Sequence, residues 1–348
     1  MALTTVIAEH PEALSIRGSV PPLSWERSLP GERVDGGAWR FVFDAAEGEI
    51  VEFKLLRGDT WSRQRNYTVA GGQVATVAPY FDHHAGRLAG GVTRLAGPDG
   101  DVAIEVYLPP SYDEQPERHY PVLYAHDGHV LFTHSRPDGV DGHTWRMDET
   151  LDFLWELGAM KQIIVVGIHS DRRRLERLTP SPDPRFGGGD GPAHLRFLVE
   201  TLKPHVDATW RTRPQRQWTA IMGASLGGLF AFHAAWTMPR VFGRAACLSP
   251  SFWWDGRAMV REVQKAQCPA PQPWIYIDSG AALDPFEDDA SLVDGFGHTY
   301  ALTQSLVQHC YEPGKNLHTL AFAGNRHDNA SWAARLATPL QLLFPREV

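Results

Sequence analysis

The chain has 348 residues, 43% hydrophobic and 21% charged, which is ordinary for a soluble globular protein and excludes a disordered or fibrous chain. The formal net charge of −8 gives no basic surface for nucleic acid and disfavours adsorption to an acidic membrane face. The N-terminal segment lacks the basic flank and apolar stretch of a signal peptide, and no later segment is long enough to span a bilayer. The sequence therefore predicts a soluble cytoplasmic protein with neither nucleic acid nor membrane as a partner.

Three cysteines, Cys247, Cys268 and Cys310, are widely spaced along the chain. An odd number at such spacing favours free thiols in a reducing compartment over a disulfide framework. None has the spacing of a metal site, so no metal and no other cofactor is expected.

Residues 1–85 are predicted to form a small all-β sandwich. Segments 40–43, 50–56 and 66–69 alternate partly between apolar and polar residues, and Gly and Pro pairs separate them. No amphipathic helix is visible in this part, so we expect the strands to bury one face each against a second sheet.

Residues 86–348 are predicted to form one α/β domain. Apolar strand-like runs alternate with segments of helical length, and such alternation indicates a mostly parallel sheet covered on both faces. The expected strands are 102–108, 121–125, 163–168, 217–222, 245–248, 274–277 and 317–322, and the expected helices are 148–157, 194–206, 226–237 and 292–310.

A candidate nucleophile, Ser225, lies between the predicted strand 217–222 and the predicted helix that follows it. It stands in the motif Gly223-Ala224-Ser225-Leu226-Gly227. A strand–turn–helix with glycine on both sides of serine is typical of a nucleophile elbow, in which the turn is too tight for larger neighbours. The motif without this context would also fit a plain glycine-rich turn.

A serine hydroxyl needs a neighbouring base, usually a histidine oriented by a carboxylate. His327 follows the predicted strand 317–322, where the base of an α/β-hydrolase is expected. The loop 278–289 offers several acids after the strand 274–277, of which Asp284 is our first choice, before Glu287 and Asp278. The alternative is a solvated acidic loop that holds no triad acid.

Acyl transfer also needs two backbone N–H groups directed at the developing oxyanion. The amide of Leu226, directly after the nucleophile, is expected to supply one of them. The turn after the strand 121–125 is expected to supply the other, and we assign it to the amide of His129.

These residues resemble the enterochelin esterase-like α/β-hydrolases, a group that includes feruloyl and acetylxylan esterases and the antigen 85 mycolyltransferases. The segments that carry the likeness are Tyr120–Gly128, Gly223–Gly228, Leu248–Trp254, and His327-Asp328 with Trp332. The resemblance covers most of residues 92–345 and implies an α/β-hydrolase fold and a serine esterase, with Ser225 as nucleophile, His327 as base and Asp284 nearest the usual acid. The chain departs from the usual pattern at Asn325-Arg326, where relatives often have two glycines.

The predicted pocket is lined by basic and aromatic candidates at the carboxyl ends of strands. Arg172 and Arg174 follow the strand 163–168, and Trp253 and Trp254 follow the strand 245–248. Guanidinium groups that face the nucleophile would favour an anionic or catecholate ester, and tryptophans could stack on an aromatic or sugar ring. A solvated arginine run and tryptophans that only wall the pocket are the alternatives.

Three hypotheses of function follow, two of them with a small-molecule ester as substrate. The first is an esterase for a siderophore lactone or a related aryl ester. The second is a feruloyl or acetyl carbohydrate-ester hydrolase whose sandwich holds a glycan. This hypothesis follows from Arg17–Trp25, Val51–Lys54 and Trp61–Tyr67, which resemble segments of starch-binding and enterochelin esterase N-terminal domains. The third is a non-catalytic glycan-binding protein. We interpret Trp25, Trp39 and Trp61 as core aromatics of the sandwich rather than a sugar platform.

Overall fold

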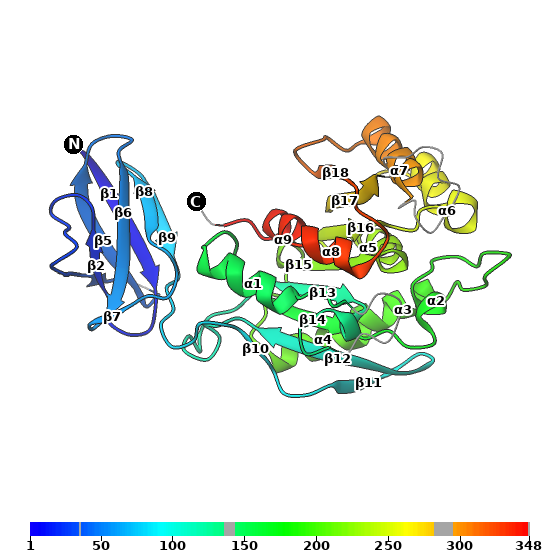
Figure 1. The fold of residues 1–348 in the computed structure, drawn as a ribbon, viewed down its shortest axis with the longest axis horizontal. Coiled ribbons are helices and arrows are strands. Elements are labelled where there is room, and N and C mark those ends of the chain that lie inside the picture. The colour runs from blue at the N-terminus through cyan, green and yellow to red at the C-terminus, as the bar shows by residue number, and fades with distance from the viewer. Residues whose placement is uncertain (35, 136–142, 282–294, 347–348) are drawn as a thin grey trace.

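The computed structural model describes residues 1–34, 36–135, 143–281 and 295–346. Two small sheets are formed by the N-terminal part of the chain, and one large sheet by the remainder (Figure 1). The large sheet and its covering helices confirm the expected α/β class, with a mostly parallel sheet preceded by small β sheets. The boundary between residues 85 and 86 stays a prediction.

The first small sheet has the order β4 (Glu32–Arg33), β5 (Ala38–Ala45), β1 (Ala2–Glu9), β9 (Val74–Val77). The second has the order β3 (Leu29–Pro30), β2 (Ser15–Gly18), β6 (Ile50–Arg57), β7 (Thr60–Trp61), with β8 (Tyr67–Ala70) also paired to β6. Alternate residues of β5 and β6 are buried in a common core that includes Phe41 and Phe53. The expected sandwich is thus antiparallel except for one pair, because β1 and β9 run parallel.

Two tryptophans of the sandwich correct the sequence-based interpretation. Trp25 and Trp61 are 38% and 39% exposed, and their ring centroids lie 6.5 Å apart. They are therefore surface residues rather than core aromatics. Trp39 is half-buried, and its indole N–H donates to the carbonyl of His10.

The large sheet contains nine strands, six of which run parallel to one another. Its order is β10 (Arg87–Leu88), β12 (Gly100–Leu108), β14 (Ile164–Ile168), β13 (Val122–His126), β15 (Thr219–Ala224), β16 (Arg244–Leu248), β17 (Trp274–Ala281), β18 (Leu317–Ala323), with β11 (Thr93–Gly97) paired to β12. Strands β13 to β18 form the parallel part, and β12 pairs antiparallel with β14. The carboxyl ends of the parallel strands consequently share one edge, where the predicted site residues follow.

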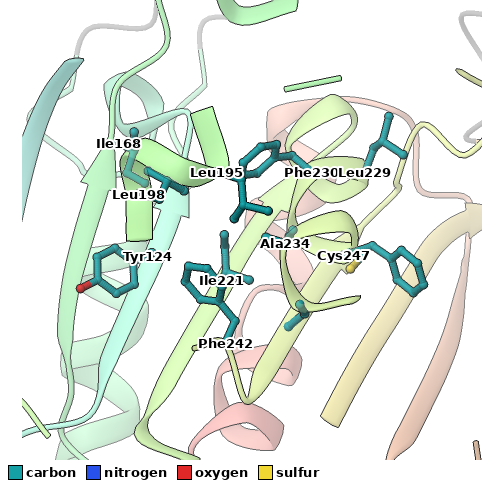
Figure 2. Packing of buried hydrophobic residues seen from close by; sticks show 14 of the residues in the cluster. Tyr124, Ile168, Leu195, Leu198, Ile221, Leu229, Phe230, Ala234, Phe242 and Cys247 are labelled. Carbon is teal, nitrogen blue, oxygen red and sulfur yellow. The ribbon is translucent and has the colours of Figure 1, made fainter. Parts of the chain in front are cut away.

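Neighbouring residues of a strand point to opposite faces of a sheet. Each face of this sheet carries buried apolar side chains, and helices cover both faces. The helices are α1 (Met147–Glu156), α2 (Arg174–Arg177), α3 (Gly191–Phe197), α4 (Lys203–Thr209), α5 (Leu226–Thr237), α6 (Trp254–Lys265), α7 (Phe296–His309), α8 (Asn329–Arg335) and α9 (Ala337–Leu343). A π-helical segment, Leu198–Leu202, joins α3 to α4. On β13, Tyr124 packs into the core that α3 and α5 cover, whereas Leu123 packs into the core that α1 and α9 cover. Figure 2 shows the first of these cores, where Leu195 and Phe230 lie near Ile221.

The cysteines depart from the expected free thiols. Cys268 and Cys310 form a disulfide with Cα atoms 6.4 Å apart, which joins the loop after α6 to the end of α7. Cys247 is free and buried in β16, where it packs in the core as a small apolar residue. Within the described ranges, no helix is long and apolar enough to cross a bilayer.

Candidate active site

Ser225 occupies a strained turn between the last residue of β15 and the first residue of α5. Its backbone angles, φ 58° and ψ −120°, are rarely adopted by a residue with a side chain. Two hydrogen bonds hold this conformation: the Ser225 N–H donates to Leu248 at 3.0 Å, and the Ser251 N–H donates to the Ser225 carbonyl at 3.0 Å. The predicted strand–turn–helix is therefore present, with Ser225 at its apex.

Close backbone packing explains the glycines around Ser225. A Cβ on Gly223 would lie 2.5 Å from the carbonyl carbon of Gly227, and one on Gly228 would lie 2.9 Å from the carbonyl oxygen of Leu248. A Cβ on Gly227 would reach only ordinary contact, 3.4 Å from His126. The steric demand thus falls on Gly223 and Gly228 more than on Gly227, the second glycine of the motif.

The surroundings of the Ser225 hydroxyl include a second hydroxyl and a helix end. Ser225 Oγ lies 3.2 Å from Ser251 Oγ. Leu226 is the first residue of α5, where backbone N–H groups lack intrahelical partners and the helix dipole is positive. Such a position suits the oxyanion role predicted for the Leu226 amide.

The turn after β13 is held by a buried carboxylate. Asp127 has φ 61° and precedes the 3₁₀ turn Gly128–Val130, which contains His129. Arg174 donates to both Asp127 oxygens at 2.7 and 2.8 Å, and Ser170 donates to one at 2.6 Å. Burial alone would raise the pKa of Asp127, but the charge and hydrogen bonds of Arg174 and the Ser170 hydroxyl outweigh it and lower the pKa to about 2.

We expect Asp127→Asn to reduce the acid sensitivity of folding. A carboxyl whose folded pKa is lowered contributes stability above its unfolded pKa and loses it as pH falls through the folded pKa. A shift from 3.8 to about 2 corresponds to about 2 kcal/mol at neutral pH, with about half lost by pH 3. Urea unfolding of wild type and Asp127→Asn at pH 7, 4 and 3 measures this difference. Identical pH dependence of the two proteins would show that the ion pair carries no such stability.

A cluster behind His129 was not predicted. Glu105 on β12 lies 3.1 Å from Nε2 of His169 and 3.2 Å from Nε2 of His134. The His169 ring leaves no room for a side chain at Gly128, because a Cβ there would lie 2.6 Å from its Cδ2 atom. Glu105 therefore positions a ring that packs directly against the turn containing His129. An acid within an apolar strand and a histidine directly after another strand were the signals available in the sequence.

His327 lies four residues after β18, in the loop that leads into α8. Its ring packs edge-on against Trp332, with centroids 5.1 Å apart. The indole N–H of Trp332 donates to Ser249 Oγ at 3.0 Å, and Ser251, two residues further on, contacts the Ser225 hydroxyl. Contacts through Trp332 and the segment 249–251 thus tie the loop of His327 to the elbow.

The three candidate acids fall in different parts of the structure. Asp284 and Glu287 lie outside the described residues. Asp278 is fully buried on β17 and ion-paired with Arg335, whose side chain is 1% exposed, at 3.1 Å. The hydroxyl of Tyr276 and the backbone N–H of Ser249 also donate to Asp278. These partners occupy both Asp278 oxygens, which is the environment of a structural carboxylate.

The predicted substrate-binding residues differ in exposure. Arg172 is exposed, whereas Arg174 is engaged with Asp127. Trp253 is half-buried, while Trp254 is 3% exposed and its indole N–H donates to the Ser181 carbonyl at 2.7 Å.

Phe186 was not predicted as part of this region. It is 51% exposed, and its ring centroid lies 5.9 Å from Trp253 and 6.0 Å from Trp254. The three rings form an aromatic cluster, in which Trp253 and Trp254 lie on the segment that continues from Ser251 and Phe186 lies between α2 and α3. Within the described ranges, no group of three or more His, Cys, Asp or Glu side chains could hold a metal ion.

Residues 96–343 match the sequence profile of the family described as "Putative esterase", which is more than half of the chain. The chain belongs to the putative esterase family. This membership confirms the expected α/β-hydrolase fold class and the enterochelin esterase-like resemblance of the sequence.

Two curated relatives match about half of the chain. The chain is 29% identical over 188 residues to the siderophore enterobactin esterase of Emericella nidulans, covering 49% of this chain and 61% of that protein. It is 28% identical over 165 residues to the uncharacterized protein YbbA of Bacillus subtilis, covering 46% of this chain and 60% of the relative. The matched region thus spans about three-fifths of the length of each relative.

A solved structure shares the fold over nearly the whole chain. The enterobactin esterase of Shigella flexneri superposes with a TM-score of 0.56 at 13% identity, covering 97% of this chain and 92% of that one. This similarity extends across the N-terminal sheets as well as the large sheet. At such low identity it establishes the common fold alone.

Proposed function

We propose that this chain is a serine carboxylic-ester hydrolase that works through an acyl-enzyme and acts on a siderophore lactone or a related aryl or catecholate ester. The observation that carries the proposal is the strained Ser225 at the junction of β15 and α5. A serine hydroxyl in a tight turn between the end of a strand and the start of a helix is positioned for nucleophilic attack.

In the proposed mechanism, Ser225 Oγ attacks the ester carbonyl carbon while His327 accepts the hydroxyl proton. The amides of Leu226 and His129 stabilise the negative charge on the carbonyl oxygen. His327 then donates its proton to the leaving alcohol oxygen as the ester C–O bond breaks, which leaves an acyl-enzyme. Water then attacks the acyl carbon while His327 takes a proton from it. The bond to Ser225 Oγ breaks, His327 returns the proton to this oxygen, and the carboxylic acid is released. Asp284 is proposed to orient His327.

The choice of siderophore or aryl esters rests on the relatives and on the aromatic cluster. Matching proteins include the siderophore enterobactin esterase of Emericella nidulans and a triacetylfusarinine C esterase of Aspergillus fumigatus. Phe186 is exposed, and its ring contacts the half-buried Trp253, which follows Ser251 by two residues. Arg172 offers an exposed guanidinium that could pair with an anionic or catecholate group.

A carbohydrate-ester hydrolase, feruloyl or acetyl, is the second candidate. The exposed pair Trp25 and Trp61 favours it, since adjacent indoles are a surface on which sugar rings can stack. The guanidinium of Arg17 lies over the Trp61 ring at 5.1 Å and donates to the Trp25 carbonyl, which fixes the pair. We correspondingly propose that this surface of the sandwich binds a glycan, whether or not the chain is a catalyst.

A substrate panel tests the choice between siderophore or aryl esters and carbohydrate esters. Catecholate siderophore lactones, feruloylated and acetylated sugars and simple alkyl esters are compared by kcat/KM, which reports differential transition-state binding. We expect aryl or catecholate esters to be preferred by about tenfold or more, equivalent to about 1.4 kcal/mol. Arg172→Ala and Trp253→Ala should reduce that preference and leave p-nitrophenyl acetate turnover largely intact.

Two comparisons complete the panel. Arg174→Ala should lower turnover of every ester, because it removes the partner of buried Asp127 rather than a substrate contact. Fastest turnover of glycan-linked esters, with the advantage lost on Trp25→Ala or Trp61→Ala, would replace the siderophore proposal with the carbohydrate-ester one.

A further inference from the structure

A cleft of about 350 Å³ lies between the N-terminal sandwich and the amino-terminal edge of the large sheet. One wall comes from β8, β9 and the residues before β8, and the other from the segments around Arg118, Lys161 and Arg346. Arg118 and Lys161 precede β13 and β14, whereas Ser225 follows the opposite end of β15. In Figure 1 the sandwich lies beside the end of the sheet from which β13 starts. The cleft is therefore separate from the proposed ester site.

Fixed hydrogen bonds hold the two walls together next to this cleft. The side-chain amide of Gln64 donates to the carbonyl of Trp155 at 3.2 Å in a buried contact. The backbone N–H of Arg65 donates to the carbonyl of Glu156 at 3.0 Å. The cleft is thus bounded by a defined contact between sandwich and α1, and its volume falls within the range of small-molecule sites, roughly 300 to 1,000 Å³.

The charge of the cleft has one sign. The charged side chains among its described lining residues are Arg65, Arg118, Lys161 and Arg346. In a chain with 41 acidic and 33 basic residues, the absence of carboxylates among the described lining residues is a local reversal of the overall charge. No described carboxylate lies within ion-pair distance of the three arginines.

The charges of two of these arginines also act on the same tyrosine side chain. Burial raises the pKa of Tyr67 in the cleft wall, while the charges of Arg118 and Arg346 both oppose that rise. Arg118 and Arg346 thus line the same cleft as Tyr67, and Arg346 lies at the end of the described chain. On the opposite wall, next to Lys161, the buried Nε2 of Gln162 has no hydrogen-bond partner among the described residues, while its Oε1 accepts from Ser111.

We propose that this cleft binds a small organic polyanion, carrying phosphate or carboxylate groups, between the sandwich and the hydrolase unit. Guanidinium groups bind both kinds of oxyanion through paired hydrogen bonds. Arg65 would contact the ligand from the sandwich and Arg118, Lys161 and Arg346 from the opposite wall. A bound anion would thus hold the two parts together without occupying the ester site.

Isothermal titration calorimetry on the full chain tests this inference, with sodium pyrophosphate and trisodium citrate as the two probes. Ionic strength is matched with NaCl, because salt screens exposed charges. We expect one probe to bind at a single site with a Kd below about 1 mM, and the probe that binds more tightly identifies the anion class. The double variant Arg65→Ala/Arg346→Ala should weaken that binding at least tenfold.

Arg94→Ala is the matched control, since it removes an exposed arginine from β11, which is not part of the cleft. It should bind the probe like wild type, and p-nitrophenyl acetate turnover should be unchanged in all variants. Absence of binding by either probe, or binding that survives in the double variant, would overturn the inference. Because no cleft residue belongs to the proposed catalytic machinery, these results do not depend on the esterase proposal.

Discussion

Ser225→Ala is expected to lower kcat/KM for p-nitrophenyl butyrate by about 10⁴-fold or more, because the nucleophile and base act as a unit. Alanine keeps the Cβ atom and adds no bulk, so the turn with φ 58° should persist and the variant should fold like wild type. Circular dichroism and urea unfolding check the fold, and steady-state kinetics measure the loss.

The matched control is Ser251→Ala, which removes the other hydroxyl of the pair, 3.2 Å away. This variant should retain most of the activity, since Ser251 does not lie at the apex of the elbow. If Ser225→Ala kept full activity, or if Ser251→Ala alone abolished it, the assignment of the nucleophile would be wrong.

Asp278→Ala is expected to destabilise the fold by about 3 to 5 kcal/mol, the typical cost of leaving a buried charge without its partner. Arg335 is 1% exposed and would lose the carboxylate that it contacts at 3.1 Å. The backbone N–H of Ser249, which donates to the same carboxylate, would lose an acceptor next to the elbow. Urea unfolding measures the change, and a wild-type stability would show that this ion pair is not structural.

Asp284→Ala separates the catalytic role predicted for Asp284 from the structural role of Asp278. As the predicted triad acid, Asp284 orients His327 and stabilises its imidazolium, so its loss should lower activity more than any other alanine change in the loop 278–289 that leaves the protein folded. Stability should stay close to wild type. If Glu287→Ala is the damaging variant instead, the choice within the loop is wrong while the elbow assignment stands.

The features that the sequence predicted well are local ones. Ser225 could be placed because its strand, glycines and helix are contiguous, and the same holds for the alternation of strands and helices from residue 100 onward. His327 could be placed after its strand from chain order alone. The segment 2–9 was not predicted as a strand, although its buried Thr4, Val6 and Ala8 alternate as in an inner strand of the sandwich.

The features that were missed depend on contacts between distant residues. Asp127 and Arg174 are 47 residues apart, and Glu105 and His169 are 64 apart, so no periodicity relates them. The disulfide joins cysteines 42 residues apart whose proximity depends on how α6 and α7 pack. Exposure of Trp25 and Trp61 likewise depends on which sandwich face stays uncovered, and their residue type alone favoured burial.

Mass mapping after reaction with a fluorophosphonate probe tests the central claim most directly, because the probe forms a stable bond only with an activated serine. We expect one label per chain, carried by the peptide that contains Ser225, with no label in Ser225→Ala and much slower labelling in His327→Ala. A label on another serine such as Ser251, or no label on an intact and folded protein, would contradict the proposed serine hydrolase.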